Sequence, residues 1–404
     1  RPPGGVPVTA APPTAASAGP LPDPLVGPVF GSYAPDEVSW LLTDLSGVAL
    51  EAPAEEREEA VQSGGAHYAE SLPVEFQPSP EYQALFGEAL QRSARRVALG
   101  VGVVAELLRR ERGDAVVLAS LARAGTPVGV LLRRAAARWG LDWPHHAVSI
   151  VRGRGLDEVA LRWLARHHDP ARVVFVDGWT GKGAIVRELS QALREAGAAG
   201  AGGFSDDLAV LADPGACVRT FGTREDYLVP SACLNSTVSG LVSRTVLNDR
   251  LLRPGQFHGA KFYAGLAGAD VSGEFLDAVS DRFDEVAAEV PAAADAVQAG
   301  PREPTFAGWA AVEELSRRYG IGDVNLVKPG VGETTRVLLR RVPWRVLVRP
   351  ERDLGHPGDL AHVRLLADQR GVAVEEVPGL AYSAVGLIHP RFTRGATGAD
   401  GRAV

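Results

Sequence analysis

Short apolar segments alternate with longer amphipathic segments in the middle of the chain, and this pattern restricts the fold more than any other feature. Apolar runs, of which RVVFVD is the clearest, occupy 115–121, 146–152, 172–177 and 206–213. Helix-length segments follow the first three runs, at 127–139, 156–167 and 183–196. Short strands separated by helices are typical of βαβ units, which build a parallel sheet. We therefore expect the α/β class, with a parallel, Rossmann-like sheet.

The chain is too long for one ordinary hydrophobic core. It has 404 residues, and domains average about 150 residues. Hydrophobic residues make up 46% and charged residues 23%, which is normal for a soluble globular protein and excludes a mainly disordered or fibrous chain. Composition predicts five segments: a Pro-rich disordered arm (1–28), a first domain (29–289), an Ala/Pro-rich linker (290–304), a second domain (305–389) and a flexible tail (390–404).

The first domain is expected to begin with a helix. Asp36 is a good helix cap, and Val38, Leu41, Leu42 and Leu45 follow at helical spacing. The second domain alternates helix and strand over 306–319, 324–328, 332–341, 344–348, 357–370 and 372–377. This order predicts a small α/β/α sandwich.

Charge and cysteine content restrict the environment and partners of the chain. The net charge of -7 excludes a uniformly basic surface that coats nucleic acid. The two cysteines, Cys217 and Cys233, have no zinc-site spacing and favour a reducing compartment. No apolar run is long enough for a membrane span, and residues 1–28 lack the pattern of a signal peptide. We expect a cytoplasmic protein without membrane contact.

Three loops that follow predicted strands are suited to bind anions. The first contains Arg123 with the backbone of Ala124, Gly125 and Thr126, before a helix that begins at Pro127. In the second, Arg152 and Arg154 alternate with Gly153 and Gly155. The third contains Asp177, suited to sugar hydroxyls, and the run Thr180, Gly181, Lys182 and Gly183 at a helix start. Each loop alone has an equally good structural explanation, but three such loops at one sheet edge indicate a phosphate-binding site.

At these loops the chain resembles the type I phosphoribosyltransferases. VVFVDGWTGKGA is similar to the family's signature for phosphoribosyl pyrophosphate, and SLARAGTPVG to its pyrophosphate loop. Residues 30–265 resemble one branch more closely: phosphoribosyltransferase-like proteins of bacterial tellurium-resistance and stress-response gene clusters, some of which are labelled StiP-type cysteine proteases. Gly178 replaces the second acid of the general signature.

The resemblance implies a phosphoribosyltransferase that uses phosphoribosyl pyrophosphate and Mg²⁺. Arg123 and the backbone of 124–126 would hold pyrophosphate, Arg152 and Arg154 would close over it, and 180–183 would hold the 5-phosphate. Mg²⁺ would bind largely through substrate oxygens, with no direct protein ligand required and Asp177 as a candidate. His67, Tyr68 and Glu70 are candidates for binding a base-like acceptor, although a surface turn explains them equally well. A polar segment at 221–240 could line the same acceptor-binding site.

The second domain contains a basic stretch. Residues 325–349 hold six basic side chains and one acid, a local charge of +5, which fits a nucleic-acid site. GVGETTR (330–336) resembles the RNA-binding loop of Pelota-type domains. The resemblance and the charge together make structured RNA the expected partner, through Lys328, Gly330, Glu333, Thr335, Arg336 and Arg345.

Two other functions remain open from the sequence. One is a non-catalytic regulator that senses phosphoribosyl pyrophosphate and binds RNA. The other is a cysteine peptidase that uses Cys233, for which His258 is the closest downstream histidine. A homodimer is also left open.

Overall fold

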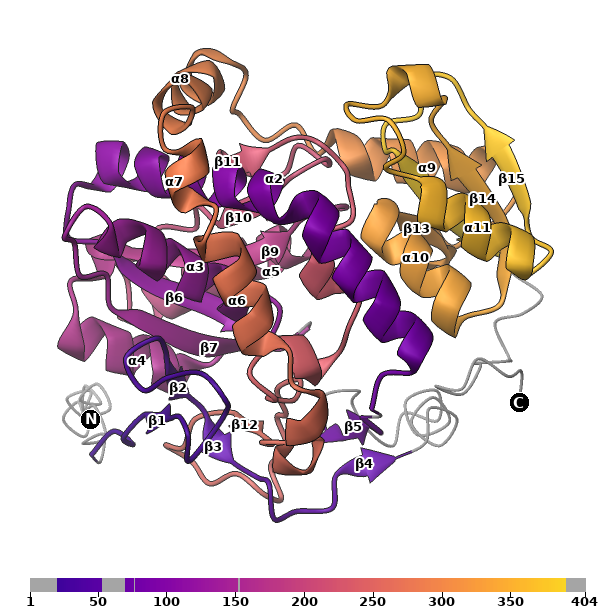
Figure 1. Ribbon diagram of the computed structural model, residues 1–404. Coiled ribbons are helices and arrows are strands. Elements are labelled where there is room, and N and C mark those ends of the chain that lie inside the picture. Colours follow the sequence, from indigo (N-terminus) through magenta and orange to yellow (C-terminus); the bar gives the residue numbers. More distant parts are fainter. Residues whose placement is uncertain (1–19, 53–69, 76, 152, 390–404) are drawn as a thin grey trace, which may run out of the picture.

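A buried strand core dominates the first part of the molecule. The computed structural model describes residues 20–52, 70–75, 77–151 and 153–389 (Figure 1). Its largest sheet has the strand order β1-β2-β7-β6-β9-β10-β11, with β8 paired to β7. The strands are β1 Leu25–Val26, β2 Ser39–Leu41, β6 Val117–Ala122, β7 His145–Val151, β8 Gly155–Leu156, β9 Val173–Trp179, β10 Ala209–Ala212 and β11 Thr220–Thr223. All pairings are parallel except those of β1 and β8. The expected α/β class with a mostly parallel sheet is confirmed.

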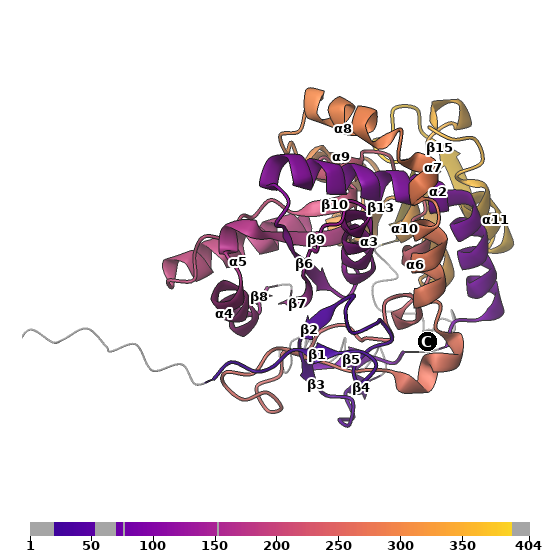
Figure 2. The ribbon, with the colours of Figure 1, turned by 60° about the vertical axis from the view of Figure 1, so that its left-hand side comes forward.

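Helices cover both faces of this sheet. Alternate residues of β9 pack in opposite directions: Val174 and Val176 join one apolar cluster, and Val173 and Phe175 join the other. Figure 2 shows α4 and α5 on one side of the sheet and α3 and α6 on the other. The helices of this part are α2 Pro80–Arg112, α3 Thr126–Ala137, α4 Glu158–His167, α5 Ala184–Ala198, α6 Ser272–Ser280, α7 Phe283–Val286 and α8 Val290–Ala299. A strand buried on both faces explains the continuous apolar runs of the sequence.

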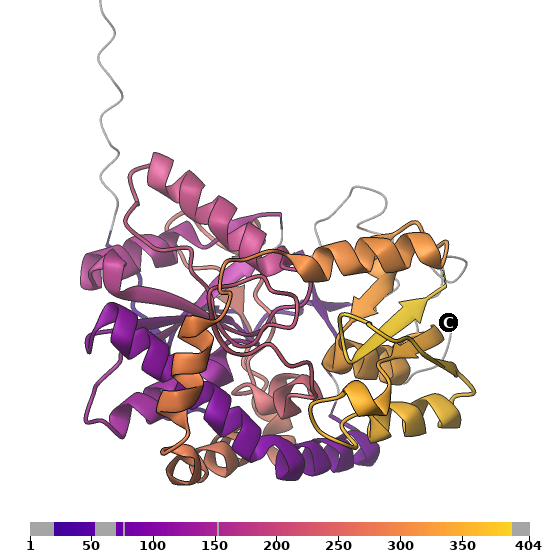
Figure 3. The ribbon, with the colours of Figure 1, turned by 90° about the horizontal axis from the view of Figure 1, so that it is seen from above.

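The second domain is the expected α/β/α sandwich. Its sheet has the order β13-β16-β14-β15, formed by β13 Val327–Pro329, β14 Pro343–Val348, β15 Ala373–Glu376 and β16 Ala384–Ile388. Helix α9 (Ala307–Arg318) packs on one face, while α10 (Val331–Arg340) and α11 (Ala361–Gln369) pack on the other. Figure 3 shows these layers from above. The sequence missed β16, although this strand lies between β13 and β14.

Three expectations about local structure were wrong. Val38 and the residues after it do not begin a helix, because 39–41 pair with β7 as strand β2 and are buried on both faces. The expected arm 1–28 is ordered in part, since Leu25 and Val26 pair with β2. The expected linker 290–304 contains helix α8, whose Val290 and Ala294 are buried against α2.

The two domains pack tightly on each other. Asp226 of the first domain accepts hydrogen bonds from the backbone N–H groups of Val331 (2.9 Å) and Ser383 (2.8 Å) in the second. Helix α2 runs across the molecule to the second domain (Figure 1), where Arg96 pairs with Asp359 at 2.9 Å. Two short two-stranded sheets complete the first domain: β3 (Thr43–Asp44) with β12 (Gly259–Ala260), and β4 (Glu51–Ala52) with β5 (Leu72–Pro73).

Candidate functional site

A cavity of about 270 Å³ lies where the two domains meet, and we call it the inter-domain cleft. One wall comes from the carboxyl ends of β6 and β9, the edge at which parallel sheets bind ligands. A second wall comes from the irregular segment 227–239, and α10 supplies the third. The polar side chains that line the cleft are Arg123, Asp177, Ser231, Asn235, Ser239, Glu333 and Arg336, and the aromatic ones are Trp179 and Tyr227.

Arg123 lies in the cleft, but an internal carboxylate already binds it. Its guanidinium donates to Glu75 Oε1 at 2.7 Å and to the carbonyl of Val242 at 3.3 Å. Glu75 also accepts the N–H of Ser236 at 2.8 Å. Burial alone would raise the pKa of Glu75, but Arg123 and Ser236 outweigh burial and lower it below the ordinary value. Arg123 and Glu75 are therefore a buried ion pair at the floor of the cleft.

The backbone after Arg123 does not form the expected open anion site. The N–H of Gly125 donates to the carbonyl of Leu121 (2.9 Å), and the N–H of Thr126 donates to that of Arg123 (3.1 Å). A Cβ on Gly125 would lie 2.4 Å from the carbonyl oxygen of Val176, so this glycine permits close packing against β9. Within the loop, only Arg123 and Ala124 line the cleft.

Asp177 lies at the tip of β9 and lines the cleft. Its carboxylate accepts the N–H of Gly178 at 2.7 Å. Burial raises its pKa to about 7, with that single hydrogen bond opposing the change. No described lysine or arginine forms an ion pair with it. A carboxyl group that titrates near neutral pH in a cleft is typical of a functional position.

The run 180–183 is covered by the second domain. The hydroxyl of Thr180 donates to Asp213, and the carbonyl of Gly181 accepts the hydroxyl of Tyr382 at 3.0 Å. Lys182 donates to carbonyls of the second domain, those of Val324 (3.0 Å) and Val327 (3.4 Å). A Cβ on Gly183 would lie 2.6 Å from the ring of Phe306. The expected 5-phosphate loop is therefore an inter-domain contact.

Five other expected residues of the first domain do not belong to the described cleft. Arg152, His67 and Tyr68 lie outside the described residues. Arg154 is exposed and does not line the cleft. In its loop, the backbone N–H groups of Gly153 and Gly155 donate hydrogen bonds to the carboxylate of Glu188. The backbone carbonyl of Glu70, which also does not line the cleft, accepts the side-chain amide of Asn248 at 3.1 Å.

The residues expected to bind RNA divide into two groups. Glu333 and Arg336 line the cleft as an ion pair of 2.9 Å, and Arg336 also donates to the carbonyl of Ala232 at 3.2 Å. Burial alone would raise the pKa of Glu333, but Arg336 and Lys328 lower it. Gly330 packs against Trp179, where a Cβ would lie 2.5 Å from the indole.

Two of these residues are directed elsewhere. Thr335 is buried, and its hydroxyl donates to the carbonyl of Val331 at 2.7 Å. Arg345 pairs with Glu375 at 2.6 Å. The basic stretch is therefore not one continuous surface, because neighbouring residues of a strand and of a helix point to different sides.

The sequence did not identify Glu75 and Asn235 as site residues. Glu75 belongs to no recognisable motif, and no pattern in the sequence around it indicates that it contacts Arg123. Asn235 lies in the segment 221–240, which the sequence marked as a possible wall of the acceptor site, and residues of this segment line the inter-domain cleft. Asn235 Oδ1 accepts the N–H of Thr237 at 3.2 Å and so fixes the turn after Cys233.

The two cysteines have different surroundings. Burial and Asp213 raise the pKa of Cys217 to about 12, and its Sγ lies 3.7 Å from the carbonyl of Gly181. Cys233 is 2% exposed, yet Ser231, Ala232, Leu234 and Asn235 on both sides of it line the cleft. His258, which we considered as its partner, is buried, and its Nδ1 lies 2.9 Å from the hydroxyl of Ser149.

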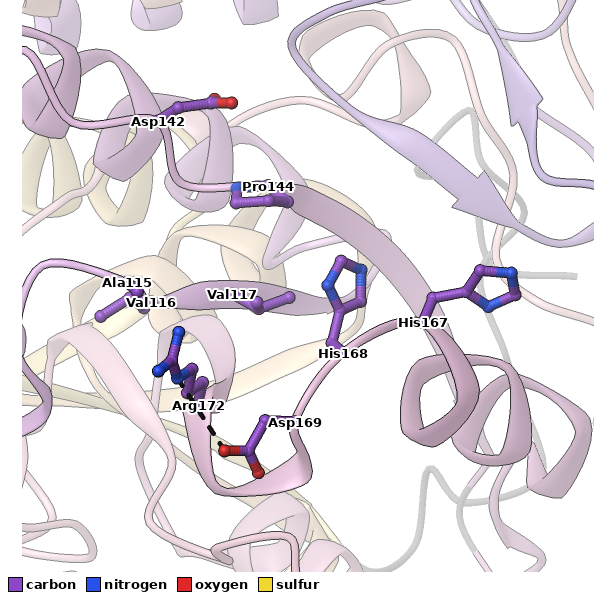
Figure 4. Close-up of a pocket in the computed structure, with 9 residues that line it drawn as sticks. All are labelled: Ala115, Val116, Val117, Asp142, Pro144, His167, His168, Asp169 and Arg172. Atoms are coloured by element: carbon purple, nitrogen blue, oxygen red, sulfur yellow. Dashed lines mark ion pairs between the residues drawn. The ribbon is translucent and has the colours of Figure 1, made fainter.

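A second cavity, of about 330 Å³, lies at the amino ends of the strands (Figure 4). His167 and His168 project in different directions there, and Arg172 pairs with Asp169 at 3.8 Å. Burial, and then the neighbouring His167, lower the pKa of His168 below its ordinary value. Among the described residues, no group of three histidine, cysteine or acidic side chains could hold a metal ion. In the same part of the chain, no helix is long and apolar enough to cross a membrane.

Comparison with known proteins decides the family. The family model described as "Tellurite-like stress resistance cysteine protease StiP" matches residues 31–280. The chain belongs to the StiP family. A curated relative, "Cysteine protease StiP" of Acinetobacter baylyi, is 34% identical over 333 residues, which cover 80% of this chain and 85% of the relative. The model of the PELOTA RNA binding domain matches residues 306–390. No solved structure is significantly similar to the chain.

Membership of the StiP family overturns the expected activity. The family and its relative are named as cysteine proteases, so the phosphoribosyltransferase prediction was wrong, and the expected use of phosphoribosyl pyrophosphate and Mg²⁺ fails with it. The structure gives a physical reason, because the second domain covers the loop 180–183 that was assigned to the 5-phosphate. A regulator that senses the same sugar phosphate meets the same obstacle. The expected Pelota-type domain is confirmed.

Proposed function

We propose that this protein is a cysteine peptidase that binds its peptide in the inter-domain cleft and uses Cys233 as the nucleophile. The observation that carries the proposal is the position of Cys233, since the residues on both sides of it line the cleft. The names of the family and of its curated relative support the reaction class.

Cys217 is the wrong cysteine for this role. The thiolate is the nucleophilic form, and a thiol with a pKa of about 12 is protonated at neutral pH. Its Sγ is turned toward the carbonyl of Gly181, beneath the contact with the second domain. Cys233 is therefore the one candidate, because the chain has two cysteines in all.

The general base in this proposal is His67. It lies within the residues matched by the family model, eight positions before Glu75. Glu75 accepts the N–H of Ser236, three residues after Cys233. His258 is less suitable, because it is buried and bonded to Ser149.

The reaction would follow the usual course for a cysteine nucleophile. His67 accepts the thiol proton, the thiolate attacks the peptide carbonyl, and the protonated imidazole then donates to the departing amine. Water hydrolyses the resulting thioester in the second half of the reaction. Because Cys233 is 2% exposed, attack requires the segment 231–235 to shift outward.

Cleavage of fluorescently labelled casein by purified variants tests the proposal. Cys233→Ala and His67→Ala are expected to abolish cleavage, whereas Cys217→Ala and His258→Ala retain it. Loss of activity in Cys217→Ala, with the fold intact by circular dichroism, would assign the nucleophile to the other cysteine. Full activity in Cys233→Ala would refute the proposal.

A second function, RNA binding, is supported by the family model that matches residues 306–390. The relevant surface is the beginning of α10, where Glu333 and Arg336 are partly exposed in the cleft. Fluorescence anisotropy with a labelled bulged RNA hairpin is expected to show weaker binding by Arg336→Ala. Identical binding by wild type and Arg336→Ala would contradict this assignment.

A further inference from the structure

The RNA-binding motif of the second domain faces the first domain and not an open surface. The beginning of α10 is held in place by Asp226, which accepts the N–H of Val331 at 2.9 Å. Gly332, Glu333 and Arg336 then line the inter-domain cleft together with residues of the first domain. An RNA that contacts this motif must therefore approach the cleft.

Two other arginines of the basic stretch are bound within the second domain, and a third, Arg341, is exposed but lies outside the motif. Arg345 is paired with Glu375, and Arg349 donates to the carbonyls of Leu380 (3.0 Å) and Ala381 (2.8 Å). Thr335 is buried. Within the motif 330–336, the guanidinium that RNA can reach is that of Arg336, whose side chain is 41% exposed.

The first domain supplies groups that suit an unpaired nucleotide. Trp179 offers an aromatic ring, and Asn235 and Ser231 offer amide and hydroxyl groups. The guanidinium of Arg123 lines the same cleft but is held by Glu75. Proteins read RNA mainly at unpaired nucleotides, which stack on aromatic or guanidinium planes and bond to polar side chains. The Pelota-type motif and these groups lie in the same cavity of about 270 Å³.

We propose that RNA bound by the second domain places one unpaired nucleotide in the inter-domain cleft, where the first domain contacts it. The RNA site is then composite, with Arg336 on one wall and Trp179 and Asn235 on the others. One consequence rests on the proposed peptidase function: RNA and peptide occupy the same cleft, so RNA inhibits cleavage competitively.

The test uses the full chain and an RNA hairpin that carries a bulge, with a fully paired hairpin as the RNA control. Ser231→Trp fills the cleft from the first domain and is expected to weaken binding of the bulged hairpin by about tenfold or more. Gln191→Trp, on the exposed side of α5, is the matched control and should bind as wild type does. Wild-type affinity in Ser231→Trp would overturn the proposal.

Photocrosslinking provides a second measurement that does not depend on variants. With 5-iodouridine in the bulge, we expect an adduct on Trp179 or Tyr227 of the first domain. Adducts confined to the second domain would show that the first domain does not contact the RNA and would overturn the composite site.

Peptide cleavage in the presence of RNA separates this proposal from the peptidase proposal. The bulged hairpin should raise KM for casein and leave kcat unchanged, whereas the paired hairpin should have little effect. If the wild type cleaves nothing, the peptidase proposal fails, while binding and crosslinking still decide the composite RNA site. If cleavage occurs but the bulged hairpin does not alter KM, the shared cleft is refuted.

Discussion

The segment 177–183, which comprises the end of β9 and the loop after it, is divided between two environments. Its first half, 177–179, lines the inter-domain cleft, and its second half, 180–183, is covered by the second domain. The sequence presents both halves as one glycine-rich, anion-binding loop. The difference shows that such a pattern indicates backbone freedom, while the domain that packs against it determines which part of the loop can meet a ligand.

The largest expected effect comes from weakening the contact between the domains that covers residues 180–183. Asp226→Ala removes the acceptor for the N–H groups of Val331 and Ser383. Leaving two buried donors unpaired costs on the order of 3 kcal/mol. We expect hydrogen exchange at these two amides to accelerate by about two orders of magnitude.

Asp277→Ala is the control for this change. Asp277 is 68% exposed in its ion pair with Arg134, so its loss should alter stability by less than about 0.5 kcal/mol. Unchanged exchange at the amides of Val331 and Ser383 in Asp226→Ala would mean that the domains are held together elsewhere.

Two glycines of the loop provide a direct comparison of its halves. Gly183 has φ +75° and faces Phe306, so Gly183→Ala should destabilise the protein by about 2 kcal/mol. For Gly178→Ala the nearest atom to the new Cβ is 3.5 Å away, an ordinary contact, and the change should cost less than about 0.5 kcal/mol. Thermal unfolding of both variants measures the difference, and equal melting temperatures would contradict the division of the loop.

Asp177→Asn tests the half of the segment that lines the cleft, through the pH dependence of protein stability. The folded-state pKa of Asp177 is about 7, above its ordinary value of 3.8. Between these pH values the folded protein keeps a proton that the unfolded chain releases, so stability falls as the pH rises. The variant should therefore be more stable than wild type at pH 8, by more than about 1 kcal/mol, and similar to it near pH 3.

Thermal melts across this pH range, with the exposed Asp281→Asn as control, measure the effect of Asp177. If the stability difference between wild type and Asp177→Asn is the same near pH 3 and at pH 8, Asp177 titrates normally.

Much of the fold was predictable because apolar runs and helix-length segments depend on local sequence. The strands β6, β7, β9 and β10 and the three helices between them were expected close to their observed positions. In the second domain, AVGLI (384–388) was missed, because a short apolar run near a chain end has no periodicity that identifies it as the central strand β16. The strand β2 was mistaken for a helix, since its burial on both faces comes from pairing with β7.

The site was less predictable than the fold. Arg123 and Asp177 were found because both follow strands, and strand ends of one parallel sheet meet at one edge. Glu75 binds Arg123 from 48 positions away in the sequence, and no local pattern reports such a contact. The covering of Lys182 by the second domain is likewise a long-range effect, and it is why the phosphate-binding prediction failed.

Alkylation of the native protein tests the central claim most directly, because the chain has only Cys217 and Cys233. After treatment with iodoacetamide at neutral pH, we predict one adduct, on Cys233, that forms at the same rate as peptidase activity is lost. Cys217 should remain unmodified, since burial and Asp213 raise its pKa to about 12. Full modification of Cys233 with cleavage intact would contradict the assignment of Cys233 as the nucleophile.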